Sequence, residues 1–221
     1  MEINARSLTQ FTPFSSLTEA QTEELLGLFS PRRAEYGKGE YLFGTPPARS
    51  LGVIVSGCVS LFSDDLHGDR DLIAQLTAGD TLGTFAGSAR TAWISAAAEE
   101  KTCVLWFSSR VFASPAAAQK PWYGAFALGI AESFARRERL LAEKIAHMGR
   151  RTTRRKLLSY LASQATEKGT NEFDIPLSRQ QLADYLAVDR SAMSAELSAL
   201  EREGYLRRNR AHFVLLRLRE T

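Results

Sequence analysis

The spacing of apolar residues divides the chain into a helical start, a β-rich middle and a mostly helical second half. Residues 15–30 repeat apolar positions at helical spacing, which predicts a helix capped by Ser16 or Thr18 with Glu19 or Gln21 three residues later. From about residue 34 to 112, short apolar runs alternate with glycine and aspartate. Many short strands with regular turns are typical of a sandwich or small barrel.

The β-rich middle contains the runs SLGVIVSGCVSLFS, RDLIAQL, WISAAA and TCVLWF. Between these runs, "SG" and "HGD" suit hairpin turns, and "AGD" suits a tight corner. The segment SPAAAQKP, with Pro115 and Pro121, is expected to be a connector that ends the β region.

A long helix is predicted from Trp122 to about Met148, interrupted only by two glycines. At about 1.5 Å a residue it would extend roughly 40 Å. Its apolar positions recur at threes, fours and sevens, which indicates a seam that pairs with another helix: Leu128, Ala131, Phe134, Leu141, Ile145 and Met148. A helix packed only on its own domain is the open alternative.

The remaining pattern predicts a compact helical domain with a small sheet. Residues 152–166 form a helix with Leu157, Leu158 and Leu161 on one face, ended by Lys168-Gly169. FDIPL is a short extended piece, because Pro176 keeps Ile175 out of the helical region. YLRRNRAHFVLLRL predicts two short strands around a basic turn.

The stretch LSRQQLADYLAVDRSAMSAEL, residues 177–197, predicts two short helices separated by about three residues. Ser178 and Gln181 form a capping-box pattern for the first helix. Asp189 is placed to cap the second. The inward positions are Leu182, Ala183 and Leu186 in the first helix and Met193, Leu197 and Leu200 in the second.

The outer face of the second helix begins with polar and small side chains, as in helices that enter a DNA groove. Arg190 can bond a guanine edge in a bidentate way, and Ala195 can meet a thymine methyl group. The start of the first helix and the basic turn suit phosphates. The predicted DNA-contacting set is Ser178, Arg179, Gln180, Asp189, Arg190, Ser191, Ser194, Ala195, Arg207, Arg208 and Arg210. Helical hairpins with polar faces also occur in proteins that do not touch DNA.

Charge is distributed unevenly over the 221 residues. Residues 1–119 carry 9 Lys/Arg and 13 Asp/Glu, a net charge of −4, whereas residues 120–221 carry 19 and 12, a net charge of +7. A basic half suggests a polyanionic partner, and a merely solvated charged surface is the open alternative. No apolar run approaches the ~18 residues of a membrane span, and the N-terminus lacks signal-peptide features. Cys58 and Cys103 lie in apolar runs and are expected to be buried thiols in a reducing cytoplasm.

Two sets of segments together resemble the CRP/FNR family of bacterial transcription regulators. The segments YGKGEYLF and SLGVIVSGCVSLFSDDLHGDRDLIAQLTAGDTLGTF are similar to its cyclic-nucleotide-binding-like β-roll. RRKLLSYL and LSRQQLADYLAVDRSAMSAELSALEREGYL are similar to its winged helix-turn-helix. The resemblance implies an α+β fold: an N-terminal double-stranded β-helix (jelly-roll) effector domain at 1–120, a dimerisation helix at 121–149 and a winged helix-turn-helix at 150–221.

The resemblance also implies a function without catalytic chemistry. The family pattern is a homodimer that binds a near-palindromic operator with half-sites about one helical turn apart. Arg190 becomes the main base-reading residue, RNA polymerase is a possible partner, and an effector in the β-roll repositions the DNA-binding domains. Many relatives carry a glutamate and a second arginine where this chain has Ser191 and Ala195. We therefore expect a different operator and more readout of DNA shape.

The expected effector site departs from the cyclic AMP pattern. Relatives that bind cyclic AMP have Gly-Glu where this chain has Gly83-Thr84, and their hydroxyl residues on the long helix align with Leu141 and Ala142. Only Arg90-Thr91-Ala92 fits the phosphate segment and suits an anion. The effector-binding prediction is therefore Gly83, Thr84, Arg90, Thr91, Ala92, Leu141 and Ala142, with a small ligand of unknown identity other than cyclic AMP. An effector-independent regulator with a vestigial β-roll remains open.

No certain cofactor follows from the sequence. Two cysteines 45 residues apart cannot hold an iron–sulfur cluster of the FNR type. His67, His147 and His212 are isolated and are expected at the surface rather than as metal ligands. A cupin-like metal-dependent β-roll enzyme is the remote alternative, because a single histidine in the roll does not make its metal site.

Overall fold

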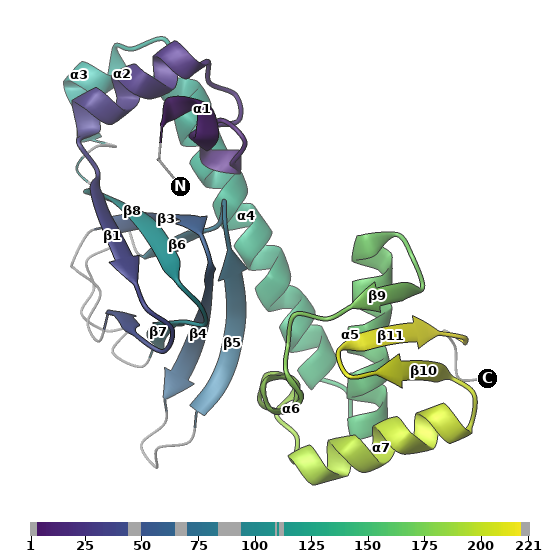
Figure 1. Ribbon diagram of the computed structural model, residues 1–221. Helices are drawn as coiled ribbons and strands as arrows, with labels where there is room; N and C mark the ends of the chain where they lie inside the picture. Colours follow the sequence, from purple (N-terminus) through teal and green to yellow (C-terminus); the bar gives the residue numbers. More distant parts are fainter. Residues whose placement is uncertain are drawn as a thin grey trace. The chain divides into compact units, whose positions relative to one another are not determined.

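The computed structural model describes residues 4–43, 50–64, 70–83, 94–108, 110 and 113–217 (Figure 1). The chain separates into two compact units. The first comprises Met1–Asp69 with Ile73–Arg139, and the second comprises Arg70–Leu72 with Leu140–Thr221. Helix α4 (Tyr123–Met148) contributes residues to both. No helix among the described residues combines the length and apolar character of a membrane span.

The first unit is built on two four-stranded sheets, with the orders β1-β8-β3-β6 and β2-β7-β4-β5. The pairs β1–β8, β3–β8, β3–β6, β2–β7 and β4–β7 are antiparallel. The chain passes repeatedly from one sheet to the other, which is the predicted double-stranded β-helix, or jelly roll. The strands are β1 (Arg32–Tyr36), β2 (Tyr41–Phe43), β3 (Ser50–Ser56), β4 (Cys58–Asp64), β5 (Arg70–Thr77), β6 (Thr81–Gly83), β7 (Ile94–Ala98) and β8 (Thr102–Ser108).

The central strands β3 and β8 have a hydrophobic core on each face, because successive side chains of a strand point to opposite sides. One core lies between the two sheets and includes Ile54, Val104 and Trp106. The other lies between this sheet and the helices; its strand residues are Leu51, Val53, Val55, Leu105 and Phe107. This double burial explains why both strands are almost continuously apolar in the sequence.

Helices α1 (Ala5–Leu8), η1 (Thr12–Phe14) and α2 (Glu19–Phe29) and the start of α4 supply the rest of the second core. Phe14 stacks on Phe126 of α4 with ring centroids 5.7 Å apart. Thr18 caps α2 in a capping box with Gln21, which confirms one of the two predicted caps. The short helices α1 and η1 carry no strong periodic pattern and were not predicted. Helix α3 (Pro115–Ala118), capped by Ser114, lies within the expected connector.

One predicted turn is wrong and another is confirmed. Ser56-Gly57 is not a hairpin turn, because β3 and β4 lie in different sheets. Gly57 has φ 90°, and a Cβ there would lie 2.4 Å from Thr102 Oγ1, so the glycine permits a tight crossing between sheets. The predicted corner at Gly79 is confirmed, since the Asp80 carboxylate accepts the Thr77 N–H at 2.8 Å. "HGD" falls on residues outside those described.

Helix α4 has nearly the predicted bounds, but its exposed seam differs from the predicted one. Phe134 packs against the core of the first unit, and Leu141 is half-buried. Leu128 is 59 % exposed and Ile145 is 71 % exposed. The exposed positions that keep the 3-4 spacing of a heptad are Leu128, Ala131, Ala135, Glu138, Ala142 and Ile145. Apart from Glu138, this face is apolar, with the three small residues Ala131, Ala135 and Ala142 between Leu128 and Ile145.

The second unit is a winged helix-turn-helix (Figure 1). Its three-stranded antiparallel sheet has the order β10-β11-β9. The predicted inward residues of both short helices are buried. Tyr160 is buried beside Leu157 and Leu161, whereas Leu158, predicted on that face, is only half-buried. The elements are α5 (Thr153–Lys168), β9 (Glu172–Asp174), α6 (Arg179–Leu186), α7 (Arg190–Arg202), β10 (Leu206–Asn209) and β11 (His212–Leu215).

Candidate nucleic-acid interface

The first helix of the pair, α6, begins at the predicted capping box. The Ser178 hydroxyl accepts the Gln181 N–H at 3.2 Å, and Gln181 Oε1 accepts the Ser178 N–H at 2.9 Å. Gln180 is exposed and donates its amide to Asp184 at 2.7 Å. Ser178 therefore lies where predicted, at an exposed helix start, and its side chain is already engaged in the cap.

A three-residue turn joins α6 to α7. Ala187 adopts a left-handed conformation with φ 48°, and the Val188 N–H bonds the Ala183 carbonyl at 3.1 Å. Lys156 of α5 donates its ammonium group to the carbonyls of Leu186 at 3.0 Å and Ala187 at 3.2 Å. Sequence reasoning missed this contact, although a cation at a helix C-terminus is a favourable pairing.

Helix α7 is held at its start by Asp189. Its carboxylate accepts the Ala192 N–H at 2.8 Å and the Ser191 hydroxyl at 2.5 Å. These hydrogen bonds, that of Ser191 first, lower the pKa of Asp189, so the group is ionised at neutral pH. Both side chains belong to the predicted DNA-contacting set, and both are engaged in organising the helix start.

The first turns of α7 present Arg190 on a rigid base. Met193, Leu197 and Leu200 are fully buried beneath it. Arg190 is exposed, and no described residue forms an ion pair with its guanidinium. Ala195 is exposed on the same helix, and the half-buried Ser194 donates its hydroxyl to the Arg190 carbonyl at 2.9 Å. The predicted base-reading residues thus share one end of one helix.

The basic turn between β10 and β11 divides its arginines between two environments. Arg207 and Arg210 are exposed. Arg208 lies over α7, where its guanidinium is 3.3 Å from Glu201 Oε2 and donates to the Ser198 hydroxyl at 2.9 Å. The two exposed arginines remain directed to solvent. Arg208 instead connects the wing, which is the β10–β11 hairpin, to α7, the expected recognition helix.

Arg179 also holds the wing in place, from the start of α6. Its guanidinium lies 5.1 Å from the centre of the Phe213 ring and donates to the Arg210 carbonyl at 2.5 Å. Burial, with a smaller effect of Arg208, lowers the pKa of Arg179. The predicted phosphate contact is therefore placed against the wing, where its packing anchors the basic turn.

The histidines occupy different environments. His212 is partly exposed and lies between Asp174 at 3.1 Å and Glu172 at 3.2 Å. The prediction that His147 lies at the surface is wrong: it is 4 % exposed, and its Nδ1 is 2.9 Å from the Ser159 hydroxyl. Burial, with a contribution from Arg150, lowers its pKa. His67 falls outside the described residues, and within those described no three His, Cys, Asp or Glu side chains form a metal-binding group.

The predicted effector residues are placed only in part. Gly83 ends β6 with φ 99°, and a Cβ there would lie 2.3 Å from the Ser50 carbonyl oxygen. Leu141 is half-buried and Ala142 is exposed on α4. Thr84, Arg90, Thr91 and Ala92 lie outside the described residues. The effector site therefore stays a prediction.

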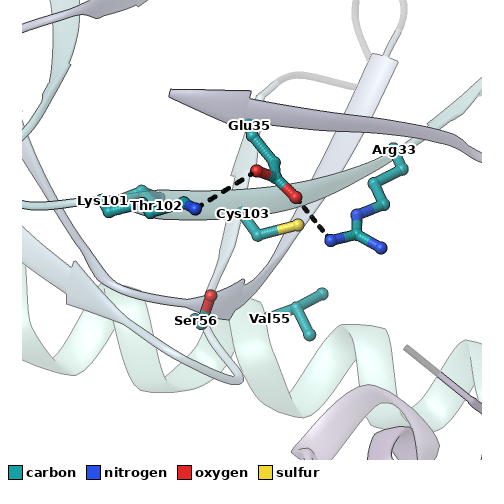
Figure 2. Close-up of a pocket in the computed structure, with 7 residues that line it drawn as sticks. All are labelled: Arg33, Glu35, Val55, Ser56, Lys101, Thr102 and Cys103. Atoms are coloured by element: carbon teal, nitrogen blue, oxygen red, sulfur yellow. Dashed lines mark hydrogen bonds and ion pairs between the residues drawn. The ribbon is translucent and has the colours of Figure 1, made fainter. Parts of the chain in front are cut away.

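A small pocket of about 190 Å³ lies on β1, β3 and β8 (Figure 2). Arg33 bonds Glu35 at 2.5 Å, and Lys101 lies 3.7 Å from the same carboxylate. The pairing, with Arg33 as the main cause, lowers the pKa of Glu35. Cys103 is buried beside this group as predicted, whereas Cys58 is only partly buried. Both cations of the pocket lie on the same carboxylate.

Comparison with known proteins agrees with this geometry. Residues 155–220 match the Crp-like helix-turn-helix domain. The nitrogen fixation regulation protein FixK of Azorhizobium caulinodans is 28 % identical over 191 residues, covering 83 % of this chain and 75 % of FixK. The transcriptional activator protein FnrL of Cereibacter sphaeroides is 37 % identical over 68 residues, covering 27 % of each chain. The structure of FixK2 from Bradyrhizobium japonicum superimposes with a TM-score of 0.66 at 22 % identity, covering 85 % of this chain and 93 % of FixK2.

Proposed function

We propose that this chain is a transcription regulator of the CRP/FNR type that binds a near-palindromic DNA site as a homodimer. The Crp-like helix-turn-helix match at residues 155–220 and the similarity to FixK support this proposal. In this proposal α7 enters the major groove of each half-site, and the wing follows the DNA backbone. The proposal includes no catalytic step. It places the protein in the bacterial cytoplasm, where it would meet its operator and RNA polymerase.

The observation that carries the proposal is the exposed guanidinium of Arg190 at the capped start of α7. An arginine in this position can donate two hydrogen bonds to O6 and N7 of a guanine. The buried residues beneath α7 and the Asp189 cap fix the direction of the helix, so little backbone conformational entropy is lost when Arg190 meets a base edge. Ala195 and Ser194 then lie further along the groove.

Backbone contacts are assigned to a smaller set than the sequence predicted. Arg207 and Arg210 are the exposed cations of the wing and would lie against phosphates. Ser178 and Gln180 at the start of α6 would add polar contacts. We assign Arg179 and Arg208 to holding the wing in place, because each already has a partner within the unit.

The exposed seam of α4 supports the dimer. Its small and apolar side chains recur with heptad spacing, and small residues allow two helices to approach closely. A second copy of the same helix can cover this seam, and the two copies would then be related by a two-fold axis. The resulting two-fold axis would relate two copies of α7 and match two half-sites in the DNA.

Regulation by a small effector in the β-roll is the remaining part of the proposal. A ligand with different affinities for two arrangements of the dimer would shift their populations. The effector-independent alternative makes the opposite prediction for ligand stabilisation. Calorimetry of the full chain against a metabolite panel separates them, because a bound effector raises the unfolding temperature and a vestigial roll leaves it unchanged.

The experiment that tests the DNA-binding assignment is a specificity measurement. An operator is first selected from a random duplex library with the full chain. The Arg190→Ala variant should then lose about 1–3 kcal/mol on the operator and little on a scrambled duplex. Arg202→Ala, an exposed arginine at the other end of α7, is the matched control and should retain both affinities. Equal operator affinity of wild type and Arg190→Ala would refute the assignment.

A further inference from the structure

The start of α5 contacts α7 at both of its ends, through the half-buried residues Arg154 and Lys156. Lys156 reaches the turn that precedes α7, where its ammonium group donates to the carbonyls of Leu186 at 3.0 Å and Ala187 at 3.2 Å. Arg154 reaches the opposite end, where its guanidinium lies 3.1 Å from Oε1 of Glu203, the C-cap of α7. One neighbouring helix therefore holds α7 at two separate points.

Arg154 places its positive charge between two carboxylates of α7. Glu196 and Glu203 are seven residues apart, so they lie on the same face of the helix. Glu196 Oε2 is buried, accepts no hydrogen bond from the described residues, and lies 3.9 Å from the Arg154 guanidinium. The hydrogen bond from Arg154 is also the main reason that the pKa of Glu203 is lowered. Without this guanidinium, the two carboxylates would repel each other and the buried oxygen would lose a compensating charge.

The turn that Lys156 holds sets the angle between α6 and α7. Ala187 adopts the left-handed conformation with φ 48°, which residues other than glycine rarely adopt. Its carbonyl and that of Leu186 lie at the C-terminus of α6, where a helix carries a partial negative charge. The Lys156 ammonium group pairs with both carbonyls and so fixes the turn against α5.

The direction of α7 matters more for base recognition than for phosphate contacts. The helix has 13 residues and begins at Arg190. Its length is about 20 Å, so a tilt of about 5° around its far end would move Arg190 by roughly 2 Å. A hydrogen bond with a usual length of about 2.9 Å does not survive such a displacement. Attraction to a phosphate falls more slowly with distance and tolerates the shift.

We propose that Arg154 and Lys156 are positioning residues for base recognition, which fix the direction of α7 so that Arg190 meets a base edge. This inference rests on the proposed DNA-binding function and gives the two basic side chains a role other than contact with phosphates. Their substitution should change the ratio of the affinities for the operator and for a scrambled duplex.

The test measures this ratio for full-length variants at one salt concentration, below the onset of thermal unfolding. Arg154→Met and Lys156→Met keep an apolar side chain and remove the charge. Each should lower the ratio about tenfold through weaker operator binding, because a misaligned Arg190 no longer discriminates between bases. Lys168→Met is the matched control, since Lys168 of the same helix also donates to a backbone carbonyl, that of Asp174 in β9. This control should lower stability and leave the ratio unchanged.

A charge swap provides a second test of Arg154 that does not depend on the Met variant being folded. Arg154→Glu and Glu203→Arg should each lower the ratio, and the double variant should recover part of it because the ion pair is restored with reversed polarity. No recovery in the double variant would overturn the role of Arg154.

The remaining outcomes separate this proposal from the DNA-binding assignment. Equal losses on both duplexes in the Met variants would indicate phosphate contacts and overturn the positioning role. Unchanged ratios would overturn it as well, in a wild type that prefers the operator and loses this preference in Arg190→Ala. A wild type without any preference for the operator would overturn both the positioning role and the DNA-binding assignment.

Discussion

Neighbouring arginines in the second unit serve different purposes, and their partners distinguish them. Arg207 is exposed, whereas Arg208 is held by Glu201 and Ser198. Arg179, predicted from sequence as a phosphate contact, packs on Phe213. At the residue scale, the number of basic side chains therefore overstates the number available to DNA. The contacts within the folded unit decide which of them can bind a phosphate.

The wing provides a matched pair of substitutions. Arg207→Ala should weaken binding to every duplex alike and lower the salt slope by about 1, because it removes one phosphate contact. Arg208→Ala should instead lower the free energy of unfolding by up to about 1 kcal/mol, since a partly exposed ion pair contributes little more. Salt-dependent binding titrations and thermal unfolding measure the two effects. A loss confined to the operator in Arg207→Ala would contradict a backbone role.

Sequence reasoning succeeded where a residue's role depends on its neighbours along the chain. The capping boxes at Thr18 and Ser178 and the Asp189 cap were predicted because their partners lie three residues away. It failed where the partner is distant in sequence. His147 looked like an isolated surface histidine, but Ser159 and Tyr160 of another helix bury it. The position of Cys103 opposite Glu35 was also missed, because it depends on the register between β1 and β8.

At the scale of elements, α4 and α5 meet at a buried histidine. Burial and the charge of Arg150 lower the pKa of His147, so the unfolded chain binds its proton more readily than the folded chain does. The stability that depends on neutral His147 is present above the ordinary histidine pKa of about 6.5 and is lost as pH falls below it. The junction should therefore weaken in acid.

Replacing His147 by glutamine tests this dependence. The free energy of unfolding of the wild type should fall between about pH 7.5 and 5, and His147→Gln should show a smaller fall because it removes the titrating group. Denaturant unfolding at several pH values provides the measurement. An identical pH profile for wild type and His147→Gln would contradict the assignment.

The seam of α4 contains one residue that opposes its pairing. Glu138 occupies a heptad position between Ala135 and Ala142. In a parallel dimer it would face its own copy in the second chain, and two carboxylates in a narrow apolar strip repel each other. The sequence suggested a different seam, because Phe134 and Leu141 have helical spacing and only the packing of the first unit shows that Phe134 is committed elsewhere.

Glu138→Leu should therefore tighten the dimer, lowering its dissociation constant at least about tenfold by replacing a charge with a buried apolar side chain. Glu132→Leu changes an exposed glutamate at the edge of the seam and should have a smaller effect. Sedimentation equilibrium gives both constants. A weaker dimer in Glu138→Leu would place the interface on another face of the helix.

At the scale of the whole molecule, the account rests on symmetry. Each chain offers one recognition helix, and the N-terminal end of one such helix contacts only a few base pairs. Pairing through α4 would present two Arg190 tips to one duplex, and the combined site then has a fixed half-site spacing. The fold was accessible from sequence because strand runs, the long helix and the helix-turn-helix follow in a characteristic order. The identity of an effector could not be predicted from sequence, because nothing in the described residues specifies a ligand.

Half-site spacing tests the central claim most directly. Inserting about 5 base pairs between the two half-sites of the selected operator rotates one of them by half a helical turn. We expect the affinity of the full chain for this duplex to fall to that for a scrambled duplex at the same salt concentration. An affinity equal to that for the original operator would contradict the proposal that a dimer holds its two Arg190 tips at a fixed separation.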